Sequence, residues 1–286
     1  NQMTYHSHLY YGGPGAGKTF ELITAFWDPD TGKPIRDGRL LLFGREDNPL
    51  IATLPEKMVK RFVSPAEKPL QFMEDFGVYM KAAVAQARKG GGPEVYGVDG
   101  FSEWNFIYLL EHTAAYGSGD RWAGWRAAKD SFLGAVQMLN PNELKAHVLA
   151  TARVAAKKKD TADRAGNVIV EGDPDWVDSK YFPSMDGWMR DHISYYFNLV
   201  SYVDADFAQV KLPDGKTKEE VVSKYWMKNT PQFLVKNTWR REWTLAQMPD
   251  YLTNPRFDDI VKAIDEAKTK AAIVLKSREA TNASIK

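Results

Sequence analysis

Cysteine is absent from all 286 residues of the sequence. Disulfide bonds and thiolate metal sites are therefore excluded, and a reducing compartment is permitted. Long apolar runs are also missing, because no stretch approaches the 18 residues that a membrane-spanning helix needs. The first residues lack the charged-then-apolar pattern of a signal peptide. We expect a soluble, cytoplasmic protein without membrane contact.

A strong charge of either sign is missing as well. The 38 lysines and arginines nearly balance the 37 aspartates and glutamates, for a formal net charge of +1. A polyanionic partner cannot be inferred from net charge alone, so any nucleic-acid site must be local. Hydrophobic residues make up 44% of the chain, which is enough to bury a substantial core.

A glycine-rich segment, Gly-Gly-Pro-Gly-Ala-Gly-Lys-Thr, occupies positions 12 to 19. It follows the apolar run His8–Tyr11 and precedes a segment, Thr19–Trp27, with apolar residues at helical spacing. Glycines at this spacing, between a strand and a helix, form the loop that surrounds nucleotide phosphates with backbone N–H groups. Lys18 supplies positive charge to the β- and γ-phosphates, and Thr19 offers a hydroxyl to Mg²⁺.

The sequence therefore predicts ATP and Mg²⁺ as ligands. The residues assigned to the nucleotide are Gly12, Gly13, Pro14, Gly15, Ala16, Gly17, Lys18, Thr19 and Phe20. Such a loop needs an acid at the end of a neighbouring strand to position the metal, and the buried run Val95–Val98 leads into Asp99. Thr19 and Asp99 are the predicted metal-binding residues. An N-cap role for Asp99 is the alternative.

Alternating strand and helix patterns predict an α/β fold with a mostly parallel sheet covered by helices. Expected strands cover residues 39–44, 95–98 and 147–150, and expected helices cover 71–89 and 127–139. Two later aromatic-rich segments, 194–203 and 224–235, are expected to add edge strands in the C-terminal half. We predict an ATPase domain over residues 1–255, then a C-terminal region, 256–286, with a helix over 257–275 and a frayed tail.

Hydrolysis also requires a residue that orients or deprotonates water. Glu46 follows the second expected strand and Glu103 lies four residues after Asp99, and strand ends of parallel sheets open on the ligand side. The residues alone leave both candidates open. The five histidines are scattered along the chain, so we expect them to be structural rather than metal ligands.

The order of these features resembles the core of RecA-type ATPases. It is most similar to that of small phage-encoded RecA-like recombinases of single-strand-annealing systems. The glycine loop is followed by a strand ending at Glu46, one ending at Asp99, and one ending at Thr151 before Arg153. The resemblance implies that Glu46 is the catalytic acid and that Thr151 senses phosphate. RecA itself has glutamine at the sensor position, so Thr151 departs from the pattern.

The same resemblance implies that the loops after the last two strands face single-stranded DNA. These loops are Tyr116–Trp125 and Arg153–Arg164. The implied DNA-binding residues are Arg121, Trp122, Lys157, Lys158, Lys159 and Arg164, which would combine phosphate neutralisation with base stacking. A solvated lysine run and core-facing tryptophans are the alternative.

A late segment, Val235 to Arg241, resembles the motif by which RadA- and DnaB-like proteins insert a cation into a neighbour's ATP site. It implies that Lys236 or Arg240 acts in trans, within a homo-oligomeric ring or filament. The function expected from the whole sequence is a DNA-stimulated ATPase of phage recombination or replication, with a single-strand-binding protein as a further partner. The alternatives are a packaging or helicase motor, a small-molecule kinase, and a nucleotide-gated assembly protein.

Overall fold

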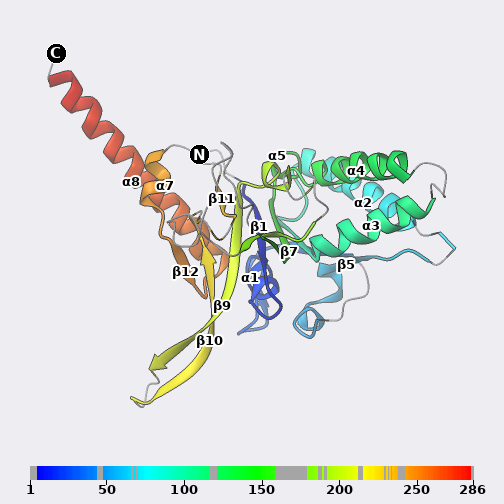
Figure 1. Ribbon diagram of the computed structural model, residues 1–286, viewed down its shortest axis with the longest axis horizontal. Helices are drawn as coiled ribbons and strands as arrows, with labels where there is room; N and C mark the ends of the chain where they lie inside the picture. The colour runs from blue at the N-terminus through cyan, green and yellow to red at the C-terminus, as the bar shows by residue number, and fades with distance from the viewer. Residues whose placement is uncertain are drawn as a thin grey trace.

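The computed structural model describes residues 5–43, 48–65, 67–68, 70–115, 121–158, 179–185, 189, 192–211, 215–228, 230, 232, 234–237 and 242–284. Its centre is a mostly parallel β-sheet with helices on both faces (Figure 1). The predicted fold class is therefore confirmed. None of the described helices is both long and apolar enough to cross a membrane.

The strands of the central sheet lie in the order β12-β10-β9-β1-β7-β6-β4-β5. Their bounds are β1 Ser7–Gly12, β4 Gly38–Phe43, β5 Val59–Phe62, β6 Val95–Asp99, β7 His147–Lys158, β9 Leu199–Lys211, β10 Thr217–Trp226 and β12 Tyr251–Thr253. All neighbours from β9 to β5 run parallel, whereas β10 and β12 are antiparallel additions at one edge. The expected edge strands in the C-terminal half are thus present.

Shorter strands complete the structure. β8 (Ser179–Pro183) pairs with the end of β7, and β11 (Lys236–Asn237) pairs with the start of β9. β2 (Trp27–Asp28) and β3 (Lys33–Pro34) form a separate small hairpin. The remaining elements are the helices α1 Lys18–Thr24, α2 Gln71–Arg88, α3 Phe101–Ala115, α4 Arg121–Gln137, α5 Pro141–Leu144, α7 Glu242–Gln247 and α8 Phe257–Ser284, with 3-10 turns at Ile51–Thr53, Glu56–Met58 and Ile193–Tyr195.

Each face of the sheet has its own core because strand side chains alternate between faces. One core packs α2, α3 and α4 onto the sheet through aromatic residues such as Phe76, Trp104 and Phe132. Trp104 stacks on Phe43 of β4 with ring centroids 4.3 Å apart. The other core packs α1 and α8 onto the opposite face, with Leu22 and Ile260 fully buried.

The outer parts of β9 and β10 form a two-stranded ribbon that projects from the body (Figure 1). β1 pairs with β9 only up to Val203, and beyond this residue β9 pairs with β10 alone. Phe207 and Val221 lie opposite each other in this ribbon and are both exposed. The ribbon leaves the sheet at the end where β1 also ends.

Several predicted boundaries were wrong. The first helix ends at Thr24 rather than Trp27, because Trp27–Asp28 turns away to pair with β3. The last helix continues to Ser284 instead of ending near residue 275, since no glycine or proline interrupts residues 276–284. The expected strands 194–203 and 224–235 are shifted: β9 starts at Leu199 and β10 ends at Trp226, because these two segments pair with each other in one long hairpin.

Candidate nucleotide-binding site

The glycine loop joins the fully buried strand β1 to helix α1, as its pattern predicts. Gly15 and Gly17 have φ angles of 73° and 91°, a left-handed conformation that side-chain-bearing residues rarely adopt. At the start of the loop, a Cβ on Gly12 would collide with the Val203 carbonyl of β9. The loop therefore needs glycine at these positions for its shape.

Lys18 lies across this loop. Its Nζ donates hydrogen bonds to the carbonyl oxygens of Gly12 and Gly13, at 3.0 and 2.6 Å. The ammonium group is thus held over the concave side of the loop, where it can neutralise an anion. Phe20, two residues after Lys18, is 41% exposed beside the loop.

Hydrogen bonds between oxygen atoms link the loop to β7, which neighbours β1, and to β6, the next strand beyond β7. The Thr19 hydroxyl lies 3.1 and 3.2 Å from the two carboxylate oxygens of Asp99, at the end of β6. The Thr151 hydroxyl of β7 also donates to the Asp99 carboxylate and accepts the Gly100 N–H at 3.1 Å. Because β7 lies between β1 and β6, Thr151 sits where it can hold Asp99 towards the loop.

These donors suit Mg²⁺, a hard cation that prefers oxygen ligands and retains several water molecules. A threonine hydroxyl and a carboxylate next to a phosphate-binding loop would supply two protein contacts to it. Among the described residues, no group of three or more His, Asp or Glu side chains could hold a metal ion by itself.

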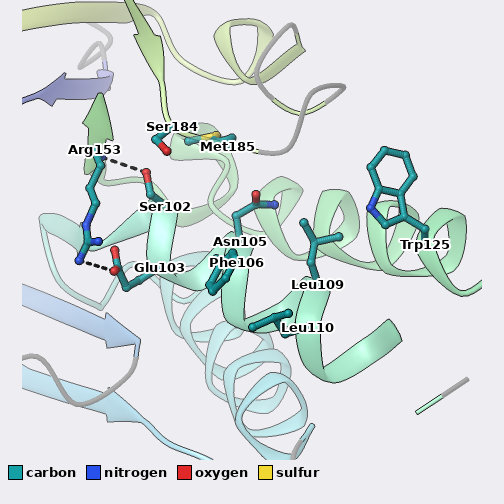
Figure 2. A pocket seen from close by; sticks show the side chains of 10 residues that line it. All are labelled: Ser102, Glu103, Asn105, Phe106, Leu109, Leu110, Trp125, Arg153, Ser184 and Met185. Carbon is teal, nitrogen blue, oxygen red and sulfur yellow. Dashed lines mark hydrogen bonds and ion pairs between the residues drawn. The ribbon is translucent and has the colours of Figure 1, made fainter. Parts of the chain in front are cut away.

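Glu103, the alternative catalytic acid, lies in the first turn of α3 and forms an ion pair with Arg153 of β7 (Figure 2). The Arg153 backbone N–H donates to the Ser102 hydroxyl at 2.9 Å. These residues form one end of a pocket of about 650 Å³ between α3, α4 and Met185. Phe106, Leu109 and Leu110 of α3 and Trp125 of α4 line the rest of it (Figure 2).

Buried polar groups lie directly behind the loop. Burial raises the pKa of the Glu21 carboxyl on α1 well above its ordinary value. Burial likewise raises the pKa of Tyr10 and Tyr225, with the nearby Glu21 charge as a further cause. The Tyr225 hydroxyl donates a hydrogen bond to the Gly17 carbonyl at 3.0 Å.

His6, directly before β1, and His147, at the start of β7, are in contact with each other. His147 Nδ1 accepts the His6 backbone N–H at 3.1 Å, and the two rings stack. Burial, followed by the charge of His147, lowers the pKa of His6 to about 4, and burial lowers that of His147 to about 4. Both rings are therefore neutral at physiological pH.

Several predicted site residues lie outside the described part of the chain: Glu46, Tyr116, Lys159, Arg164 and Arg240. Lys157 and Lys158 belong to β7 rather than to a loop, because this strand continues to pair with β8. Arg121 and Trp122 begin helix α4, so the expected loop over 116–125 was also wrong from residue 121 onwards. The segment from 121 is rich in helix-forming residues, which explains the early start.

Lys236 lies in β11, which pairs with the start of β9, away from the glycine loop of the same chain. Its ammonium donates to the Ser194 carbonyl and lies 4.7 Å from the centre of the Tyr195 ring. Sequence reasoning missed Tyr225 and Ser223, which reach the glycine loop from β10. No local pattern could have found them, since the contact spans more than 200 positions.

No protein-family model and no curated protein matches the chain. Among solved structures, it is similar to the assembled ATPase EscN of the type III secretion system of enteropathogenic E. coli, with 15% identity and a TM-score of 0.37. That match covers 70% of this chain and 43% of the other. A structure of EscN with its central stalk EscO shows 13% identity and a TM-score of 0.42, over 70% and 42% of the two chains. The chain thus spans less than half of either EscN chain, and so distant a likeness carries no information on substrate or partner.

Proposed function

We propose that the protein binds ATP with Mg²⁺ and hydrolyses it, as an oligomeric RecA-like ATPase that acts on single-stranded DNA in phage recombination or replication. The observation that carries the ATPase proposal is the arrangement of Thr19, Asp99 and Thr151 beside the Lys18 ammonium. A phosphate cradle alone would explain nucleotide binding. A carboxylate held in contact with the loop threonine adds the means to bind a metal at the reacting phosphate.

In this proposal the loop amides and Lys18 hold the phosphates, and Lys18 exchanges its bonds to the Gly12 and Gly13 carbonyls for phosphate oxygens. Thr19 and Asp99 would hold Mg²⁺, which would supply charge neutralisation at the transferring phosphoryl group. Thr151 orients the Asp99 carboxylate. In this mechanism the side chains do little covalent chemistry. The rate depends on how they position the reacting groups and neutralise the phosphate charge.

Glu46 is the proposed general base, by its position after β4. Glu103 remains the competitor, although its ion pair with Arg153 favours a structural role. Steady-state ATPase rates of Glu46→Gln and Glu103→Gln separate the two. We expect a loss of about 100-fold or more for Glu46→Gln and a small effect for Glu103→Gln. The reverse order would assign the role to Glu103, and unchanged turnover in both would favour a nucleotide-gated assembly protein.

The DNA proposal rests on basic residues near the carboxyl ends of the parallel strands. Lys157 and Lys158 follow Arg153 along β7, beyond the level of Thr151, and Arg153 is exposed. With Lys159, Arg164, Arg121 and Trp122, they would give a local basic surface with an aromatic face. We further propose that Lys236 or Arg240 completes a neighbour's site in a homo-oligomer, and that a single-strand-binding protein is a partner.

The decisive experiment measures ATPase rates with and without single-stranded DNA at about 50 to 100 mM salt, where phosphate contacts are strong. Lys18→Ala should abolish turnover in both conditions. Lys157→Ala, Lys158→Ala and Lys159→Ala, combined in one variant, should keep the basal rate and lose the stimulation. If DNA neither binds nor stimulates the wild type, the DNA proposal is wrong and the ATPase proposal stands. Turnover that persists in Lys18→Ala would overturn the ATPase proposal.

A further inference from the structure

The hydroxyl of Tyr225, on β10 between β9 and β12, reaches the glycine loop. It donates to the Gly17 carbonyl at 3.0 Å, and the same carbonyl accepts the Glu21 N–H at 3.0 Å. Tyr225 is only 1% exposed, and its ring meets Tyr10 edge-on with centroids 5.6 Å apart. Packing therefore fixes the position of the ring, and with it the position of the hydroxyl oxygen.

This hydrogen bond acts on the orientation of a peptide group. The Gly17–Lys18 peptide is planar and trans, so its C=O and its N–H point in opposite directions. Fixing the Gly17 carbonyl towards Tyr225 and α1 therefore turns the Lys18 N–H the other way. That direction is the interior of the loop, where backbone N–H groups bind phosphate.

The strand that carries Tyr225 is itself held in place. Ser223, two residues earlier on the same face, would lie 2.5 Å from a Cβ on Gly17, so the loop and β10 are in close contact. The Ser223 N–H donates to the side-chain oxygen of Asn254 at 2.6 Å, and the Asn254 N–H donates to the Ser223 carbonyl at 2.8 Å. Lys224 pairs with Asp206 across the ribbon. Gly17 is therefore in close contact with a strand that is held by hydrogen bonds to Asn254 and by an ion pair with Asp206.

We propose that Tyr225 is a positioning residue for the phosphate-binding loop, acting through the Gly17 carbonyl on the Lys18 N–H. This inference rests on the proposed function, since it assumes that the loop binds nucleotide phosphates. It assigns strand β10 a part in nucleotide affinity. It does not give Tyr225 a contact with the nucleotide or the metal.

The test compares Tyr225→Phe with Tyr10→Phe. Both variants keep the ring and lose one buried hydroxyl beside Glu21, but only Tyr225 reaches the loop, whereas the Tyr10 hydroxyl lies 2.8 Å from His8 Nδ1. Binding of a non-hydrolysable ATP analogue with Mg²⁺ is measured by calorimetry, alongside kcat, KM for ATP, and thermal unfolding without nucleotide.

We expect Tyr225→Phe to raise Kd and KM about fivefold, the effect of one neutral hydrogen bond, with kcat within about twofold of wild type. Tyr10→Phe should leave Kd and KM unchanged even if both variants lose stability. Wild-type affinity in Tyr225→Phe, or an equal loss of affinity in both variants, would overturn this inference alone. If the wild type binds no analogue, the proposed function fails and this inference fails with it.

Discussion

Glu21 lies in a buried environment that favours the neutral form of its carboxyl group. It is fully buried one turn into α1, and burial raises its pKa well above the ordinary value. The unfolded chain releases this proton near pH 4.5, whereas the folded chain retains it to higher pH. The contribution of Glu21 to stability is therefore lost as the pH rises above about 4.5.

Glu21→Gln should consequently stabilise the protein at pH 8, because glutamine resembles the neutral acid and never ionises. The gain should shrink as the pH falls and vanish below about pH 4.5. Urea unfolding of both proteins at pH 8, 6 and 4.5 measures this difference in the free energy of unfolding. A gain independent of pH would show that better packing, and not ionisation, is the cause.

If the protein hydrolyses ATP as proposed, we expect Thr151 to affect turnover without contacting the substrate. Its hydroxyl bonds both the Asp99 carboxylate and the Gly100 N–H. Thr151→Val keeps the shape and removes both bonds, so we expect kcat to fall about tenfold or more, as for other groups that orient a metal ligand. Thr151→Ser retains the hydroxyl and should keep most of the activity. If the valine variant equals the serine variant in kcat and in Mg²⁺ dependence, the hydroxyl has no such role.

At the scale of single elements, helix α3 carries aromatic residues in two different surroundings, the core and the surface. Its residues are apolar on nearly all sides, yet Trp104 is fully buried against Phe43 and Phe76, whereas Phe106 is 62% exposed. Only contact with the sheet distinguishes the two positions. The periodicity of the segment did not indicate which aromatic residue would face the core.

Trp104→Ala should therefore lower the free energy of unfolding by about 3 to 5 kcal/mol, the usual cost of removing a buried aromatic side chain. Phe106→Ala, two positions along the same helix, is the matched control and should cost less than about 1 kcal/mol. Chemical denaturation of both variants checks the difference. Similar losses would mean that the exposed face of α3 is also packed in solution.

Element ends were harder to predict than element types. β7 continues to Lys158 because it gains a partner in β8, and α4 begins at Arg121 directly after the glycine-containing segment. The polar and basic composition of residues 157–159 is typical of a loop. The strand over Lys157 and Lys158 depends on pairing with Lys180 and Ser179, a distant segment that no local pattern reveals.

At the scale of the whole molecule, α8 extends well beyond the body (Figure 1). Its buried residues repeat at helical spacing from Phe257 to Ala271, and Ile273 is already 62% exposed. None of the described side chains at positions 272–277 is buried.

Deletion of residues 276–286 should accordingly change Tm by no more than about 2 °C. Deletion from residue 257 onwards should abolish folding, because it removes Phe257, Ile260 and Ile264 from the core between α8 and the sheet. Thermal unfolding measures both effects. A large Tm loss on deleting 276–286, together with a smaller particle in size-exclusion chromatography, would show that this segment holds copies of the chain together.

The sequence by itself determined the glycine loop, the acid at the end of β6 and the parallel α/β class. These features are local: glycine spacing sets a backbone shape, and buried apolar runs between helical patterns imply a covered parallel sheet. Tertiary structure alone decided which strands are neighbours, and hence that Thr151 meets Asp99 and that Arg153 pairs with Glu103. It also brought Tyr225 of β10 to Gly17. Such contacts join residues far apart in the chain, and they arise from strand order, which local propensity does not encode.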